Sequence, residues 1–558
     1  MHYYFLLAVV LYFSLVFELA FSTPTNDEFV PISDQSKGKD TATVQENAKI
    51  ENNMPKLRIL IMTWRTAVSE SHYIYHRKLA ELLVADTENV EKVLLLVFNS
   101  DIANQSTEEP VEYGGRLLVW TRTIIARVDK TAKKMINFLD NWSVWKDTSG
   151  MFLPIANIAE TSQLDFLLDY PQLIEQLQTF KFNVGIMETR EFSMGIFRVL
   201  STIKKYVIAF NMAPTIAHWK FYGYEKIVGA MPGRDLARIG DHKYATENAI
   251  KENPTYFRER NENLFIKPLE SSSLLLHAKY KEAISEGKLP RKNFEEFFSQ
   301  ENFTIWDMMK RVDLWLANAQ PLLDFPIVEQ EIEKANLKGQ KKRVVHFIGG
   351  ITTPTGAVPK LNADTKQIFE SANSENGGVV LLSFGSIVQM NDDEAHAVAF
   401  KNIVLDVFKQ YPQMNMIIKW GKQTPIGTGE QYKMLADNVY AKGWLEQSAI
   451  LETRPKLFIT HGGQNSIIEA IKFGVPIILF PFFGDHYNCS EAMAARGVAK
   501  VLDIRSKTLA KNLAEAINDI FANYPIYKQK IDELNKKLNP IDPAKDFLDA
   551  FRQLRKSL

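Results

Sequence analysis

Short apolar runs alternate with segments of helical periodicity along most of the chain. Residues 57–62 and 93–98 are apolar runs of strand length, and residues 72–84 between them carry apolar side chains at helical spacing. Runs of this length are typical of strands that are buried on both faces of a parallel sheet. The pattern therefore predicts that the folded part of the chain opens with a strand–helix–strand unit.

The same alternation continues in two series. Further strands are predicted at residues 182–187, 206–210, 344–348, 379–383, 415–420, 456–460 and 475–480, whereas residues 116–180 are predicted to be mostly helical and residues 306–316 a helix or a strand. Residues 349–356 separate the two series and have the Gly, Thr and Pro content of a linker. We therefore predict an α/β protein with two Rossmann-like domains that face each other across a cleft. The predicted segments are 55–348, a linker at 349–365, 366–538, and a C-terminal helix at 539–558.

Residues 456–480 combine a predicted strand, a glycine turn and a helix. His461 and two glycines follow the strand, and Asn465 begins an apolar-periodic helix that stops at Gly474. The first N–H groups of a helix have no partner within it and carry partial positive charge, and glycine lets a ligand approach the backbone closely. This turn is therefore predicted to bind an anion such as a phosphate group.

A glycine turn of this kind can also be purely structural. Six polar residues, however, gather at the same predicted edge of the sheet: His461, Asn465, Ser466, Glu469, Asp485 and His486. Ligands of open α/β sheets bind at the carboxyl ends of the strands, where these residues fall. Their concentration favours a ligand site over a structural turn.

The same stretch resembles the signature of the UDP-glycosyltransferase family, in particular the animal UDP-glucuronosyltransferases. The matching residues are Trp444, Gln447, Pro455, Phe458, His461, Gly462, Gly463, Asn465, Ser466, Glu469, Ala470, Gly474, Val475, Pro476, Pro481, Phe483, Asp485 and Asn488. Two positions depart from the signature: Glu446 stands where the family usually has Pro, and His486 where it usually has Gln. The resemblance extends from residue 56 to 555 and implies the GT-B architecture, with the donor on the C-terminal domain and the acceptor on the N-terminal one.

The resemblance also implies how the donor is bound. Trp444 is expected to stack on uracil, and Gln447 and Glu469 to hydrogen-bond the ribose. The residues expected to hold the diphosphate are Ser386, His461, Gly463, Asn465 and Ser466, and those expected to contact sugar hydroxyls are Asp485 and His486.

His72 is the candidate general base. It lies at the predicted start of a helix, where positive charge is disfavoured, so we expect a lowered pKa and a neutral imidazole that can accept a proton. Residues 71–75 resemble the family segment that carries the catalytic histidine, and His76 is expected to serve packing or to lie on the surface. Glu188, after the strand 182–187, stands near the family's orienting acid, with Glu191 as the alternative.

The sugar donor is less well defined by the sequence. The family favours glucuronic acid or glucose, whereas some relatives with His at the position of His486 use galactose. Imidazole offers one donor and one acceptor with a reach different from that of an amide. Glucuronosyl transfer to a small lipophilic acceptor is the main prediction, hexosyl transfer is its rival, and a nucleotide-sugar binder without catalysis is an alternative of another class.

Composition narrows the partners further. Lys plus Arg and Asp plus Glu both number 66, so the formal net charge of zero argues against a nucleic-acid partner. A single cysteine, Cys489, excludes an internal disulfide and a thiolate metal cluster. Asp392 to Glu394 is predicted to be an acidic helix start rather than a metal site. We expect no metal and no cofactor, with the UDP-sugar as co-substrate.

The ends of the chain suggest the secretory pathway. Residues 1–22 are predicted to be a cleaved signal peptide or, alternatively, an uncleaved anchor, and the polar residues 23–54 a disordered arm. Glycosylation motifs begin at Asn104, Asn141, Asn302 and Asn488, of which the last is not expected to be used. Downstream of residue 480 we find no apolar run of about 18 residues, so no C-terminal membrane span is expected.

Overall fold

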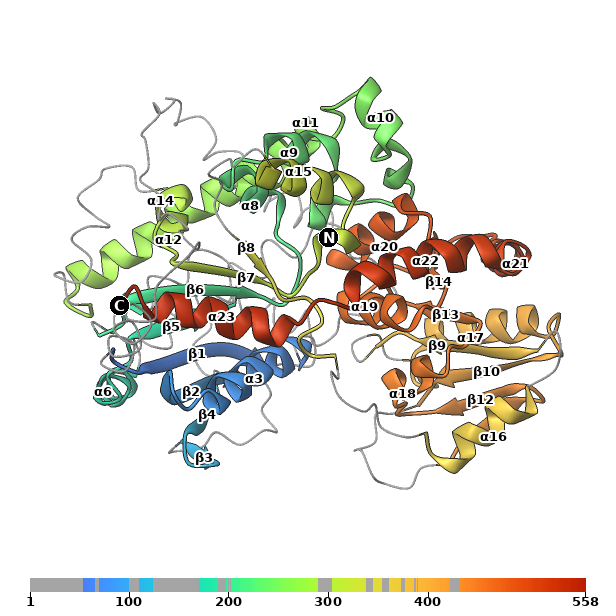
Figure 1. Ribbon diagram of the computed structural model, residues 1–558, viewed down its shortest axis with the longest axis horizontal. Coiled ribbons are helices and arrows are strands. Elements are labelled where there is room, and N and C mark those ends of the chain that lie inside the picture. Colours follow the sequence, from blue (N-terminus) through green and yellow to red (C-terminus); the bar gives the residue numbers. More distant parts are fainter. Residues whose placement is uncertain are drawn as a thin grey trace, which may run out of the picture. The chain divides into compact units, whose positions relative to one another are not determined.

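The computed structural model describes most of the chain from residue 54 onward (Figure 1). The described residues are 54–65, 70–99, 110–123, 168, 170–188, 197–198, 200, 202–289, 304–337, 345–353, 361–372, 377–385, 388, 390–421 and 431–558. The predicted signal peptide, nearly all of the predicted arm, Glu191, Ser386 and three of the glycosylation motifs lie outside these residues.

An eight-stranded sheet forms the first half of the described chain, in the order β3-β4-β2-β1-β5-β6-β7-β8. The strands are β1 (Leu57–Arg65), β2 (Val90–Asn99), β3 (Val111–Tyr113), β4 (Leu117–Thr123), β5 (Val184–Met187), β6 (Lys205–Phe210), β7 (Leu314–Ala317) and β8 (Val345–Phe347). All neighbouring pairs are parallel except β3 with β4. The central strands are apolar and buried, as strands covered on both faces should be.

Helical segments connect and follow these strands. They are α3 (Glu70–Ala85), α6 (Pro171–Thr179), α8 (Ile216–Phe221), α9 (Glu225–Ala230), α10 (Glu247–Glu252), α11 (Arg258–Asn261), α12 (Lys267–Ser285), α14 (Ile305–Met309) and α15 (Pro326–Leu337), with the short turns η2 (Arg234–Leu236), η3 (Asp241–Tyr244), η4 (Glu262–Ile266) and η6 (Pro321–Leu323).

A seven-stranded sheet forms the second half, in the order β11-β12-β10-β9-β13-β14-β15. The strands are β9 (Gly378–Ser383), β10 (Met414–Lys419), β11 (Lys433–Ala436), β12 (Val439–Lys442), β13 (Leu457–Thr460), β14 (Ile477–Leu479) and β15 (Ala499–Val501). The helices are α16 (Ala363–Ser371), α17 (Ala395–Phe408), α18 (Gln447–Glu452), α19 (Gln464–Phe473), α20 (Asp485–Ala495), α21 (Leu509–Ala522), α22 (Tyr524–Leu538) and α23 (Pro543–Arg555). All neighbouring strands are parallel except β11 with β12.

The predicted strands are all present, shifted by a few residues at their ends. One expectation is wrong: residues 117–123 are not helical but form β4, which pairs in parallel with β2. Leu117 to Trp120 are all buried at this position, so the run is a sheet strand with both faces covered. The segment 306–316 contains both predicted alternatives, since α14 is followed by β7.

The last helix, α23, packs against the first sheet although it follows the second (Figure 1). Its apolar face, which includes Phe547 and Phe551, joins the same buried cluster as Ile59 in β1 and Leu79 in α3. Arg555 at its end donates hydrogen bonds to the backbone oxygens of Met54 (2.6 Å) and Pro55 (3.1 Å). The final segment therefore completes the core of the first half.

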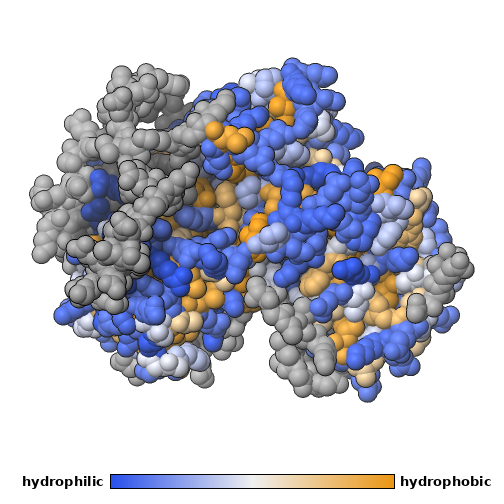
Figure 2. Space-filling model, viewed as in Figure 1, coloured by the Kyte–Doolittle hydropathy of each residue, from blue (hydrophilic) through white to orange (hydrophobic). Residues whose placement is uncertain are grey.

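The exposed face has the polarity of a globular protein. Hydrophilic residues cover most of the coloured surface in Figure 2, and apolar residues show there in scattered groups. Within the described ranges, no helix combines the length and the apolar character that a membrane crossing requires.

Candidate active site

The carboxyl ends of four neighbouring strands place polar residues at one edge of the first sheet. His72 lies in the first turn of α3, which follows β1, and Glu188, Asn211 and Asn318 come directly after β5, β6 and β7. Parallel strands end at the same edge of a sheet, so residues far apart in sequence meet there.

His72 and Glu188 form a hydrogen-bonded pair between Nδ1 and Oε1. A carboxylate only accepts hydrogen bonds, so Nδ1 carries the proton and Nε2 has the lone pair that can take another. The backbone N–H of Asn211 also donates to Glu188 Oε1 at 3.2 Å, which holds the carboxylate in place. The side chain of His72 is 23% exposed and that of Glu188 is 9% exposed, so a substrate can reach the former.

The electrostatics of His72 differ from the expectation for a helix start. Burial works to lower the pKa of His72, but the charge and hydrogen bond of Glu188 outweigh it and raise the pKa above the ordinary 6.5. The expected lowering is therefore wrong, because a carboxylate in contact acts more strongly than a helix terminus. His76 is fully buried, and burial lowers its pKa; its Nδ1 lies 3.0 Å from Thr63 Oγ1, in keeping with the expected packing role.

The glycine turn after β13 has the predicted form. Gly463 is the N-cap of α19, and the helix ends at Gly474 in the left-handed conformation (φ 74°). Gly462 also has a positive φ, and a Cβ there would come within 2.3 Å of Ser490 Oγ. A Cβ on Gly463 would lie 2.4 Å from His461 Nε2, so the imidazole packs directly over the backbone of the turn.

Three of the predicted donor-site residues meet in one cluster. Gln447 Nε2 donates to Glu469 Oε2 (2.6 Å) and to Ser466 Oγ (3.2 Å). Ser448, which the sequence analysis missed, donates its hydroxyl to Glu469 Oε1 at 2.6 Å. Burial raises the pKa of Glu469, and these donors partly offset that effect. The cluster presents hydrogen-bonding groups suited to a pair of hydroxyls.

Lys419 is a second residue that the sequence analysis missed. It ends β10, its Nζ donates to the backbone oxygen of Gly385 at 2.7 Å, and it lies 5.1 Å from the centroid of the Trp444 ring. Burial lowers the pKa of Lys419 to about 8, and an anion beside it would favour the charged form again. Its place at the carboxyl end of an apolar strand is the sequence signal that could have identified it. The expected Ser386 lies outside the described residues, next to Gly385.

His461 and His486 pack against each other with ring centroids 4.6 Å apart and planes at 85°. Burial lowers the pKa of His461 well below its usual value and the pKa of His486 to about 3, so both rings are neutral. His461 can therefore offer a hydrogen bond to a diphosphate but not a full charge. His486 is 4% exposed and also packs on Phe483, with ring centroids 4.3 Å apart.

Residues from both halves surround His72. Asp485, the first residue of α20, acts to raise the pKa of His72, and Arg234 of η2 acts to lower it, so both charges lie within reach of the imidazole. Arg234 is 8% exposed and was not singled out from the sequence. The structure thus brings together His72, Glu188 and Asp485 from segments more than 100 residues apart.

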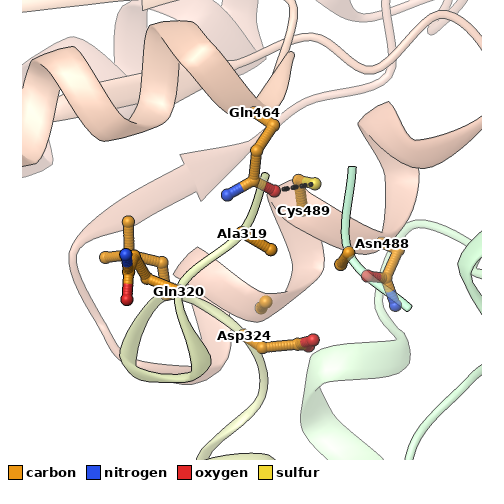
Figure 3. Close-up of a pocket in the computed structure, with 9 residues that line it drawn as sticks. Ala319, Gln320, Asp324, Gln464, Asn488 and Cys489 are labelled. Atoms are coloured by element: carbon orange, nitrogen blue, oxygen red, sulfur yellow. Dashed lines mark hydrogen bonds between the residues drawn. The ribbon is translucent and has the colours of Figure 1, made fainter. Parts of the chain in front are cut away.

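A small cavity lies between α19, α20 and the segment before α15 (Figure 3). The thiol of Cys489 donates to Gln464 Oε1 at 3.1 Å beside it. The cavity has a volume of about 10 Å³, which is room for one water at most, so it can hold neither a sugar nor an acceptor. Burial raises the pKa of Asp324 on its wall to about 6.

Among the residues that the structure describes, no group of three His, Cys, Asp or Glu side chains is arranged to hold a metal ion. The expectation of a metal-independent site stays a prediction.

Solved structures with the same architecture define the class of fold. The glycotransferase of kitacinnamycin is 16% identical and covers 90% of this chain and 100% of its own, with a TM-score of 0.51. A UDP-glucosyltransferase from Polygonum tinctorium is 14% identical and covers 91% and 100%, with a TM-score of 0.53. The fold is that of the GT-B glycosyltransferases, as predicted.

The sequence comparisons show which family the chain resembles. Residues 274–547 match the model of the UDP-glucuronosyl and UDP-glucosyl transferases. Human UDP-glucuronosyltransferase 2B17 is 28% identical over 263 residues, which are 45% of this chain and 44% of the relative. Human 2-hydroxyacylsphingosine 1-beta-galactosyltransferase is 28% identical over 235 residues, 42% and 38% of the two chains. The chain thus spans less than half the length of these curated relatives.

Proposed function

We propose that the protein is an inverting UDP-glycosyltransferase that transfers a sugar, glucuronic acid in the first place, to a hydroxyl of a small lipophilic acceptor. The observation that carries this proposal is the His72–Glu188 pair, which lies within electrostatic reach of Asp485 beside the glycine turn of a donor-type site. The match to the family model supports the nucleotide-sugar donor.

In the proposed reaction, His72 acts as the base. Nε2 removes the proton of the acceptor hydroxyl as its oxygen attacks the anomeric carbon from the face opposite UDP. A new carbon–oxygen bond forms, the bond from the anomeric carbon to the phosphate oxygen breaks, and UDP leaves with that electron pair. Glu188 stabilises the imidazolium that forms, as the acid of a triad does.

The leaving diphosphate would lie against the N-terminus of α19. Its negative charge would be stabilised by backbone N–H groups there, by a hydrogen bond from neutral His461 and by the ammonium of Lys419. Gln447, Ser448 and Glu469 would bind the ribose, and Trp444 the uracil. The N-terminus of α19, His461 and Lys419 would together stabilise the negative charge of the leaving diphosphate.

The sugar is the finer part of the proposal. The similarity to glucuronosyltransferases supports UDP-glucuronate, and the similarity to a galactosyltransferase supports a hexose donor. His486 packs against His461, so a replacement of His486 would also affect that neighbour.

The first test measures acceptor-dependent UDP release by the purified chain with UDP-glucuronate, UDP-glucose and UDP-galactose in separate reactions, with pooled phenols and sterols as acceptors. We expect release with one donor above the others. His72→Ala should lower the rate about 100- to 10,000-fold, while UDP binding by calorimetry stays within about twofold. His396→Ala, an exposed histidine on α17, is the control and should leave the rate unchanged.

The alternative of another class, a nucleotide-sugar binder without catalysis, gives a different result. UDP binding without acceptor-dependent release from any donor would support it. Unchanged turnover in His72→Ala would remove His72 from the mechanism.

A further inference from the structure

We propose that Asn318 is a positioning residue that sets the amide of Asn465 so that its N–H group faces the diphosphate of the donor. The inference rests on the proposed function, because it concerns the same nucleotide site. Asn318 follows β7 in the first half, whereas Asn465 lies in the first turn of α19 in the second.

One hydrogen bond determines which way the side chain of Asn318 points. Asn318 is fully buried, and its Oδ1 accepts from the backbone N–H of Gly350 at 3.3 Å. A backbone N–H only donates, so the atom facing Gly350 must be the oxygen of the amide. The amide nitrogen of Asn318 must then face the other way.

Both hydrogens of that nitrogen are used. Asn318 Nδ2 donates to Asn211 Oδ1 at 2.9 Å and to Asn465 Oδ1 at 3.2 Å. An N–H donor can be met only by an acceptor, so the oxygen of Asn465 is held toward Asn318. The hydroxyl of Thr352 lies 3.5 Å from the same oxygen and can donate to it.

The hydrogen bond from Asn318 also fixes where the amide nitrogen of Asn465 points. With Oδ1 turned to Asn318, Nδ2 is the atom that remains for a ligand at the start of α19. A negatively charged diphosphate needs N–H donors there, and an amide turned the other way would present an oxygen and repel it. Asn318 thus selects the orientation that suits an anion.

The same side chain also reaches the catalytic pair. Asn211 is held through its side-chain oxygen by Asn318, and its backbone N–H donates to Glu188, the partner of His72. A continuous series of hydrogen bonds therefore joins Asn465 of the donor turn to His72.

A purely structural role for Asn318 would give a different pattern of UDP-binding free energies among the variants. Such a role would lower stability and would weaken the site whether or not Asn465 is present. A positioning role makes the effect of Asn318 on UDP binding depend on Asn465. A double-mutant cycle separates the two cases.

The experiment measures UDP binding to the full chain by calorimetry for the wild type, Asn318→Leu, Asn465→Ala and the double variant. We expect Asn318→Leu to weaken UDP binding about tenfold, the equivalent of about 1.4 kcal/mol, and to add less than about twofold in the Asn465→Ala background. The KM for the donor should rise similarly, with kcat at saturating donor within about threefold.

Asn415→Leu is the matched control. Asn415 is a buried asparagine near the start of β10, and its side chain donates hydrogen bonds to the backbone oxygen of Ile368 and to the hydroxyl of Ser371. It should lower stability without changing UDP binding.

Asn318→Asp is the second variant, for the case in which the leucine variant does not fold. It keeps an acceptor for Gly350 but has no N–H for Asn465, so it should weaken UDP binding at least as much as leucine. An equal loss in both backgrounds, or no loss at all, would overturn the inference. Wild-type protein that binds no UDP would overturn the proposed function as well, so the two failures are distinct.

Discussion

At the scale of residues, neighbours decide what each histidine of the site can do. Glu188 raises the pKa of His72, whereas burial lowers the pKa of His461 and brings that of His486 to about 3. One imidazole is thereby made a stronger base, and two are kept neutral beside the glycine turn. The residue type alone did not distinguish these roles, because the difference comes from contacts.

The first prediction at this scale concerns Glu188→Gln. The amide keeps the shape but removes the negative charge, so the pKa of His72 should fall. The base works only when neutral, so activity declines as pH falls through the pKa of His72. In the variant this acid limb should move to lower pH, and kcat should drop about 100-fold or more because the imidazolium is no longer stabilised. A pH–rate profile of both proteins checks this.

Glu81→Gln is the matched control for that experiment. Glu81 pairs with Arg77 on the exposed part of α3, with its side chain 48% exposed. Its replacement should leave both kcat and the acid limb unchanged. An acid limb that stays in place in Glu188→Gln would show that Glu188 does not set the basicity of His72.

At the scale of elements, α23 shows how a terminal helix can complete a distant core. Phe547, Ala550, Phe551 and Leu554 recur at helical spacing and lie buried against β1 and α3. Their opposite face carries Asp549, Arg552 and Gln553. Periodicity predicted the helix, but it did not identify the surface that the helix covers.

Phe551→Ala should lower the free energy of unfolding by about 3 to 5 kcal/mol, because the side chain of Phe551 is only 2% exposed and its removal leaves a cavity. Denaturant unfolding followed by circular dichroism measures the change. Gln553→Ala, on the exposed face of the same helix, should stay within about 0.5 kcal/mol of the wild type. Equal stabilities of the two variants would mean that α23 contributes little to the fold.

At the scale of the whole molecule, α20 joins the two halves of the described chain. Glu491 is fully buried and accepts hydrogen bonds from Gly240 N (3.1 Å), His242 N (2.7 Å) and His242 Nδ1 (2.7 Å). Arg496, at the end of the helix, donates to the backbone oxygens of Asp324 (2.6 Å) and Pro321 (3.1 Å). The helix that begins with Asp485 is thus fixed to the first half along its length.

Glu491→Gln should lower the free energy of unfolding by about 3 kcal/mol. The replacement turns an N–H group toward donors that the carboxylate satisfies, and unsatisfied buried groups are costly. Thermal and denaturant unfolding of the full chain measure this loss. Glu515→Gln, on an exposed ion pair of α21, should have no measurable effect. A loss no larger than that of Glu515→Gln would mean that the contact does not stabilise the protein.

Local sequence pattern was enough for much of the fold. Apolar runs and glycine turns predicted the central strands of both sheets, and the segment after β13 predicted the turn that carries His461, Gly463 and Asn465. These features depend on residues that are neighbours in the chain, so a short stretch of sequence is enough to predict them. The helical expectation for residues 117–123 failed because burial in the sheet, a tertiary property, decided the conformation.

The sequence by itself determined where the central strands lie and that a glycine turn opens the helix after β13, since spacing and residue type specify both. Only the tertiary structure decided that Lys419 approaches Trp444, that Arg234 and Asp485 lie near His72, and that Asn318 contacts Asn465. These contacts depend on the order of strands and on the packing of two halves. Charge, burial and hydrogen bonding act through space, so no local pattern contains them.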